Sequence, residues 1–212
     1  MTLSHQYQNR FVAVKYFLNC YRALSDGRVG IRLLEEKVRT DSFLFSDWKI
    51  LWLGTCAVLR TSINLFQVDA KSCINSDIRE SIKSEWASIK LNQDKHAIFW
   101  KFLRKERDHI IHEYKWTAYE TWLLEDGTSE TPVFSLLAVK PETAKSVLVM
   151  RHGFFEGRNS IELLSEGADW VEQRIFSAIE RAGFDPEEQR RLGDFQKRIP
   201  LGKSLLGGAY ES

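Results

Sequence analysis

Two arginine–histidine pairs in the segment RKERDHIIHEY have the residue types needed for chemistry on a phosphate group. Four residues separate Arg104 from His109, and four separate Arg107 from His112. A guanidinium binds a phosphate through two parallel hydrogen bonds and stabilises the negative charge that develops during its transfer. An imidazole has an unperturbed pKa of about 6.5, so it exchanges protons readily at neutral pH. Either pair is therefore a candidate site.

The position of each arginine on a helix separates the two pairs. The expected apolar stripe of this helix passes through Trp100, Leu103, Ile110, Ile111 and Tyr114. Arg107 falls within that stripe, where a guanidinium costs several kcal/mol unless it is paired. Asp108 precedes His112 by one turn, and we expect it to hold one imidazole nitrogen. Arg104 has no such burial, and the run RKERD is typical of a solvated helix face. We therefore favour Arg107 and His112, supported by Asp108.

Composition limits the classes of protein to which the chain can belong. The 212 residues are 43% hydrophobic, which suits one globular domain with a substantial core. Thirty basic and 29 acidic residues leave a net charge of +1, so a nucleic-acid site must be a local patch. The three cysteines form no CxxC pair and indicate a reducing compartment. With a polar N-terminus and an apolar run of only about ten residues at 50–59, we expect a cytoplasmic protein without a membrane span.

Hydrophobic periodicity predicts a mainly α protein. Helices are expected over 7–24, 31–40, from Ser46 or Asp47 to Val68, over 75–91, and from a cap at Asp94 to Trp116. The helix ending near Val68 is apolar nearly all round, so we expect it to be central. The candidate site lies near the end of the last of these helices.

After Trp116 the pattern changes from helical to extended. Runs of β-branched and aromatic residues separated by Asp126-Gly127 and Pro141 predict a small antiparallel β-meander. Helical spacing returns over 160–182, where Gly183 and Pro186 end it. We therefore expect a helical bundle over 1–116, a β-meander insert over 117–156, and C-terminal helices over 157–212 that pack on the same domain and end in a flexible tail.

The second arginine–histidine pair resembles a known family signature. Arg107, His112 and Tyr114 match the RX4HXY motif of HepT-type HEPN domains, which are helical bundles. About 0.4 Arg-x4-His pairs are expected by chance in this composition, but only about 0.01 with the tyrosine. Only the Arg107 copy has it. The likeness is specific over 103–116 and architectural over 46–116. Asp108 stands where HepT-like sequences most often have Asn, which leaves the subfamily open.

The resemblance implies a metal-independent endoribonuclease that uses no cofactor. In HEPN ribonucleases the arginine contacts the scissile phosphate, and the histidine is the general acid and base while a ribose 2′-hydroxyl attacks. Residues five apart lie about 140° apart on a straight helix, so a single pair does not share one face. HEPN domains form twofold dimers that bring both motifs to one cleft, and we expect a homodimer here. In HepT systems Tyr114 corresponds to a tyrosine adenylylated by a nucleotidyltransferase antitoxin, which predicts a toxin or defence role with that partner.

Two alternatives accompany this interpretation. The chain could be a HEPN-like module that binds nucleotide or RNA, or dimerises, without catalysis. The sequence VLVMRHG, ending at Gly153, is similar to the Arg-His-Gly of histidine phosphatases, but His152 is the last histidine of the chain and that fold needs a second one downstream. For Tyr114 itself, packing on an apolar stripe is the ordinary alternative to a functional role. No cluster of residues has the spacing of a zinc site.

Overall fold

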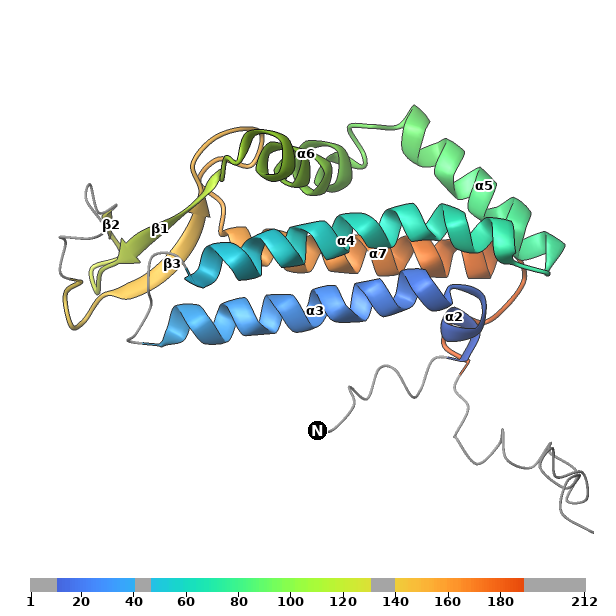
Figure 1. Cartoon of the computed structure of the whole chain (residues 1–212), viewed down its shortest axis with the longest axis horizontal. Coiled ribbons are helices and arrows are strands. Elements are labelled where there is room, and N and C mark those ends of the chain that lie inside the picture. The colour runs from blue at the N-terminus through green and yellow to red at the C-terminus, as the bar shows by residue number, and fades with distance from the viewer. Residues whose placement is uncertain (1–10, 41–46, 131–139, 189–212) are drawn as a thin grey trace, which may run out of the picture.

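The computed structural model describes residues 11–40, 47–130 and 140–188, which form a bundle of helices with a three-stranded sheet at one end (Figure 1). The helices are α2 (Phe11–Tyr16), α3 (Leu18–Arg39), α4 (Asp47–Ser72), α5 (Ser76–Leu91), α6 (Arg104–Asp108) and α7 (Ser160–Arg181). Two π-helical segments, η1 (Ile98–Leu103) and η2 (His109–Glu113), flank α6. The strands are β1 (Ala118–Leu123), β2 (Ser129–Glu130) and β3 (Lys145–Met150). The predicted mainly α fold with a small antiparallel sheet is confirmed.

Helix α4 lies at the centre of the bundle, as its all-round apolar pattern predicts. It contacts α3, α5, α6 and α7, and its side chains Trp52, Leu59, Ile63 and Phe66 are completely buried. In Figure 1 it runs in front of α7, with α3 below it and α5 and α6 above it. The helical run η1, α6 and η2, which carries the candidate site and is called the motif helix below, therefore packs on α4.

Helix α3 is continuous where the sequence pattern predicted two helices with a break between them. Gly27 and Gly30, in the stretch between the two predicted helices, lie inside α3 and face α4. A Cβ atom at Gly27 would lie 2.4 Å from Leu59 Cδ2, and one at Gly30 would lie 2.3 Å from Thr55 Oγ1. The glycines therefore allow the two helices to approach closely, and packing outweighs their low helix propensity.

Asparagine side chains begin two of the later helices. Asn75 Oδ1 accepts a hydrogen bond from the backbone N–H of Ile78 at the start of α5, and Asn159 Oδ1 accepts from Ile161 at the start of α7. Asp94, expected to cap the motif helix, makes no such bond, because that helix begins at η1 with Ala97 before it. The boundaries predicted for α5 and α7 are confirmed to within a residue.

The sheet has the order β2-β1-β3, so the strands do not form the predicted meander. In a meander the second strand would lie between the other two, but here β1 is central. The register of β1 with β3 runs over six residue pairs from Ala118↔Met150 to Leu123↔Lys145, whereas β2 pairs at two positions. Leu148 and Met150 of β3 are buried, while both residues of β2 are exposed. The apolar side chains of β3 are therefore buried against the helices, whereas the short, polar β2 lies at the exposed edge of the sheet.

Helix α7 is part of the bundle and not an appendage, since it contacts α3, α4 and α5. Just after it, the Phe184 ring lies 5.8 Å from the Tyr16 ring of α2, so the described chain begins and ends at the same end of the bundle. The sheet is at the opposite end (Figure 1). A second C-terminal helix and the flexible tail, both predicted, fall outside the described residues. None of the described helices is long and apolar enough to cross a membrane.

Replacement of Gly27 by alanine tests the close contact of α3 with α4. We expect Gly27→Ala to lower the free energy of unfolding by about 1–3 kcal/mol, because the methyl group overlaps Leu59. Gly54→Ala in α4 is the matched control: its Cβ would meet nothing within 4 Å, so we expect a gain of about 0.5–1 kcal/mol. Urea unfolding at low protein concentration measures both. Equal effects of the two substitutions would contradict the packing argument.

Candidate functional site

The motif lies on one helical run formed by η1, α6 and η2. Its buried face consists of Phe99, Phe102, Leu103, Glu106 and Ile110. Arg107 lies beside that face with 36% of its side chain exposed, so the prediction that it occupies the apolar stripe is wrong. The π turns change the angle between successive residues, which moves the buried face away from a projection drawn for a straight α-helix. Glu106 occupies the buried position instead.

The π turn η2 also changes the relation between Arg107 and His112. The backbone N–H of Tyr114 donates to the carbonyls of His109 and Ile110, so the helix closes partly through bonds between residues five apart. Such a turn brings residues five apart closer to one face than the 140° expected for a straight helix. His112 is exposed on η2, and no side-chain hydrogen bond joins it to another residue in the described ranges. Both predicted catalytic side chains are therefore accessible.

Asp108 pairs with arginines rather than with the imidazole. Arg107 Nη1 donates a hydrogen bond to Asp108 Oδ1 over 2.9 Å, and Arg104 Nε lies 3.8 Å from Asp108 Oδ2. The prediction that Asp108 orients His112 is not what the geometry shows. Asp108 follows Arg107 directly and lies one turn after Arg104, so it is within reach of both guanidinium groups. It holds the two arginines side by side.

A third arginine, from α4, joins this group. The Arg60 guanidinium lies over the ring of Phe99 at 5.2 Å, and Arg104 lies over the ring of Trp100 at 5.2 Å. Burial lowers the pKa of Arg60, Asp108 opposes that shift, and the positive charges of Arg104 and Arg107 add to it. Arg60, Arg104 and Arg107, which we call the arginine cluster, thus interact electrostatically. The cluster makes a basic patch on a chain of nearly balanced charge.

Sequence reasoning missed Arg60, although a signal was present. Between Ile50 and Val68 it is the one charged residue of the sequence. A single arginine in an otherwise uncharged stretch of a helix needs a reason for its place. Its contact with the motif could not be derived, because the two segments are separated by α5. The same holds for Arg104, which was assigned to a solvated face but shares Asp108 with Arg107.

Tyr114 ends the motif helix in an unusual conformation. Its φ of 52° places it in the left-handed region, where it is the one non-glycine residue of the described ranges. A residue of this conformation commonly ends a helix, but it is usually glycine. Its side chain is 73% exposed, and its ring meets Trp116 edge to face at 4.5 Å. The expectation that Tyr114 packs on an apolar stripe is therefore wrong, and its side chain is open to solvent.

Glu106 is buried on the face of the motif helix that packs on α4. Thr117 Oγ1 donates a hydrogen bond to Glu106 Oε1, while Oε2 has no hydrogen-bond partner in the described part of the chain. Burial raises the pKa of the Glu106 carboxyl, and the Thr117 hydrogen bond opposes that rise. Burial, and then the charge of Glu106, raise the pKa of the neighbouring Cys56 thiol on α4. The carboxyl links the motif helix to the first residue before β1.

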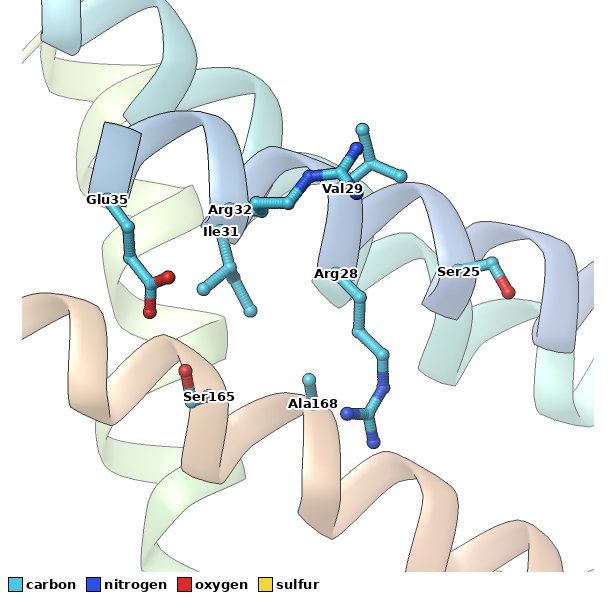
Figure 2. A pocket seen from close by; sticks show the side chains of 8 residues that line it. All are labelled: Ser25, Arg28, Val29, Ile31, Arg32, Glu35, Ser165 and Ala168. Atoms are coloured by element: carbon cyan, nitrogen blue, oxygen red, sulfur yellow. The ribbon is translucent and has the colours of Figure 1, made fainter. Parts of the chain in front are cut away.

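Two other features lie apart from this site. Arg151 and His152, the pair similar to a histidine phosphatase motif, are exposed after β3, with the Arg151 guanidinium 4.7 Å from the centre of the Tyr119 ring. A hollow between α3 and α7 contains no motif residue (Figure 2). There Arg28 reaches from α3 toward α7 and pairs with Asp169 at 2.9 Å and Glu172 at 3.0 Å, so it joins the two helices. Over the ranges described, no three His, Cys, Asp or Glu side chains are grouped to hold a metal.

The buried carboxyl predicts a particular pH dependence of stability. A raised pKa means that the folded state binds the Glu106 proton more tightly than the unfolded state does. The stability contribution is therefore present below the ordinary pKa of 4.5 and is lost as the pH rises through the folded value. Glutamine does not titrate, so we expect Glu106→Gln to abolish this loss of folding stability with rising pH. The free energy of unfolding of the variant, compared with that of the wild type, should therefore increase from pH 4 toward pH 8.

Chemical unfolding across that pH range measures the effect, and Glu180→Gln on the exposed end of α7 is the matched control. A Glu106→Gln profile parallel to that of the wild type would contradict the assignment. Glutamine keeps an oxygen that can accept from Thr117, so the substitution changes the titration and not the hydrogen bond.

Comparison of the chain with models of known protein families, with curated protein sequences and with solved structures found no match. The resemblance to HEPN domains therefore stays a prediction from the sequence, carried by Arg107, His112 and Tyr114.

Proposed function

We propose that the chain is a metal-independent endoribonuclease of HEPN type, with Arg107 and His112 as its catalytic residues. The observation that carries the proposal is the arginine cluster beside an accessible histidine. Three guanidinium groups offer donors to adjacent phosphates of one RNA strand, and Trp100 and Phe99 already present ring faces beneath two of them. Local charge of this kind is what a protein of balanced composition needs to bind RNA.

The proposed reaction uses the ribose hydroxyl of the substrate as nucleophile. The 2′-oxygen forms a bond to phosphorus, and the bond from phosphorus to the 5′-oxygen of the next nucleotide breaks. An imidazole takes the proton of the 2′-hydroxyl, and an imidazolium returns a proton to the leaving oxygen. Arg107 stabilises the charge on the phosphate oxygens. The products are a 2′,3′-cyclic phosphate and a 5′-hydroxyl end. Two copies of His112 in a homodimer would supply the base and the acid together.

The other motif residues support this proposal in different ways. Asp108 holds Arg107 next to Arg104, so it positions donors rather than moving a proton. The hydroxyl of Tyr114 is on an exposed side chain at the helix end, where a modifying nucleotidyltransferase could reach it. A toxin or defence role, with such an enzyme as antitoxin, follows if that modification occurs.

A second function is favoured by one contact. The carboxylate of Asp108 already occupies donors of Arg107 that a phosphate would need. If this pairing persists with RNA present, the chain is a HEPN-like nucleotide-binding, RNA-binding or dimerisation module without catalysis. The variant His112→Ala distinguishes the two functions. A ribonuclease would lose RNA cleavage in this variant, whereas a binding module cleaves no RNA and does not require His112.

RNA cleavage in EDTA is the decisive measurement. We expect the wild type to cleave single-stranded RNA and to leave cyclic phosphate ends. Arg107→Ala and His112→Ala should each lower the rate by about a hundredfold or more. Arg32→Ala on α3 and His152→Ala after β3 are the matched controls, with exposed side chains outside the motif, and should leave the rate unchanged. No cleavage by the wild type, or full activity in both motif variants, would disprove the ribonuclease.

The arginine cluster is tested separately with RNA that cannot be cut. A 2′-O-methyl oligonucleotide lacks the attacking hydroxyl, so its binding reports contacts alone. We expect Arg60→Ala, Arg104→Ala and Arg107→Ala each to weaken binding and to reduce the slope of log K against log salt by about 0.7–1. Arg32→Ala should change neither quantity. An unchanged slope in Arg60→Ala would remove α4 from the RNA site.

A further inference from the structure

A cavity of about 180 Å³ opens between the second half of α4 and α5. Its wall is apolar, and its rim is polar and basic. The wall consists of Ala70, Ile82 and Trp86, and the rim of Gln67, Lys71, Arg79 and Lys83. Ala70 and Ile82 are buried, whereas Trp86 is half-buried. Because an apolar protein cavity of about 150 Å³ holds one benzene ring, the size suits a single aromatic ring of a ligand.

The rim is positively charged, and none of the described residues that line the cavity is acidic. Lys71 and Arg79 form no ion pair within the described part of the chain, while Lys83 pairs with the exposed Glu80 at 2.6 Å. A pair between exposed side chains is weak, so a ligand anion can compete for Lys83. Lys90 Nζ lies over the indole ring of the wall at 5.8 Å and adds a further charge. The hollows beside α3, by contrast, contain glutamates as well as cations. The cavity therefore suits a ligand that joins an aromatic ring to negative charge.

An aromatic contact joins this cavity to the arginine cluster. The ring of Trp86 meets the ring of Phe99 at 6.0 Å, and the Arg60 guanidinium lies over Phe99 at 5.2 Å. Arg60, Gln67 and Lys71 are seven and four residues apart on α4, so they share one side of that helix. In Figure 1, α5 and the motif helix both lie above α4. The eleven residues from Arg60 to Lys71 span about 16 Å of helix, the length of about five stacked nucleotides.

We propose that this cavity is a subsite for one nucleobase of an RNA strand that continues from the arginine cluster, an inference that rests on the proposed function. The base packs against the Trp86 ring, and such packing accepts any base because every base has an aromatic face. Lys71 and Arg79 pair with the phosphates next to that base. Gln67 presents both amide donors and an acceptor for its edge. The ribonuclease thus binds a strand that extends several nucleotides beyond the cleaved bond.

Binding of 2′-O-methyl decauridine, which cannot be cut, to the full chain tests the subsite. We expect Trp86→Ala to weaken binding about fivefold to a hundredfold without changing its salt dependence, and Trp86→Phe to keep most of the affinity. The double variant Lys71→Ala with Arg79→Ala should weaken binding and reduce the slope of log K against log salt by about 1.4. Phe154→Ala and Arg32→Ala, whose side chains are exposed outside the cavity, are the matched controls and should bind as the wild type does. Circular dichroism checks that each variant is folded.

Uridine 5′-monophosphate distinguishes a subsite for a strand from a site for a free nucleotide. We expect the wild type to bind it at least about a hundredfold more weakly than the decamer, because a single nucleotide does not also reach the arginine cluster. Equal affinity for the two would overturn the strand assignment. Decamer binding that the Lys71→Ala and Arg79→Ala double variant leaves unchanged would overturn the subsite itself.

The subsite and the ribonuclease fail separately in these measurements. In RNA cleavage we expect Trp86→Ala to raise KM at least about fivefold and to leave kcat within about twofold, because the subsite is remote from the cleaved bond. A wild type that binds the decamer through Trp86 but cuts no RNA would leave the subsite intact and disprove only the ribonuclease. Cleavage by Trp86→Ala with an unchanged KM would disprove only the subsite.

Discussion

Close packing of α3 on α4 is the constraint on which the rest of the structure depends. Gly27 and Gly30 let the backbone of α3 approach the side chains of Leu59 and Thr55, so α3 covers one side of α4 along its length. With that side closed, α7 and the motif helix cover two further sides. The Arg60 guanidinium lies on the side of α4 that meets the motif helix, over the ring of Phe99, and also donates a hydrogen bond to Asn64 of its own helix. The arginine cluster is therefore a consequence of how α4 is enclosed.

The same enclosure explains the buried carboxyl beneath the site. Glu106 faces Trp52 and Cys56 of α4, where an apolar side chain would be the ordinary choice. Its hydrogen bond from Thr117 joins the end of the motif helix to the beginning of the sheet. A buried charged or polar group is costly, but it fixes the position of the elements that satisfy it. Because Arg107 follows Glu106 directly in α6, fixing Glu106 against α4 also fixes the position from which the Arg107 side chain extends.

The sequence was sufficient to predict the elements but not their irregularities. Periodicity identified α4, α5 and α7, because long helices with one buried face repeat the same signal many times. It could not identify η1 and η2, since the insertion of a π turn depends on packing against α4 and leaves no local residue pattern. That one omission misplaced both Arg107 and Tyr114. The order of the sheet was missed for a related reason: which strand β1 pairs with depends on the burial of β3 against the bundle.

Of the candidate site, the motif residues could be chosen from the sequence, but their partners could not. Arg107, His112 and Tyr114 stand at a spacing that chance rarely produces. The ion pairs of Asp108 and the approach of Arg60 are contacts between side chains whose directions are decided only in the folded chain. Residue type and spacing thus identify which residues could carry out the chemistry, and three-dimensional packing decides which other side chains contact them.

The contact between Tyr16 and Phe184 has a practical consequence for how the molecule can be joined to others. Both boundaries of the described chain lie at the end of the bundle away from the sheet. A linker, a surface anchor or a fluorescent label attached through either boundary would therefore hold the molecule by the same end. The motif helix would stay clear of the attachment, and neighbouring ends make the unit easy to insert into a longer chain.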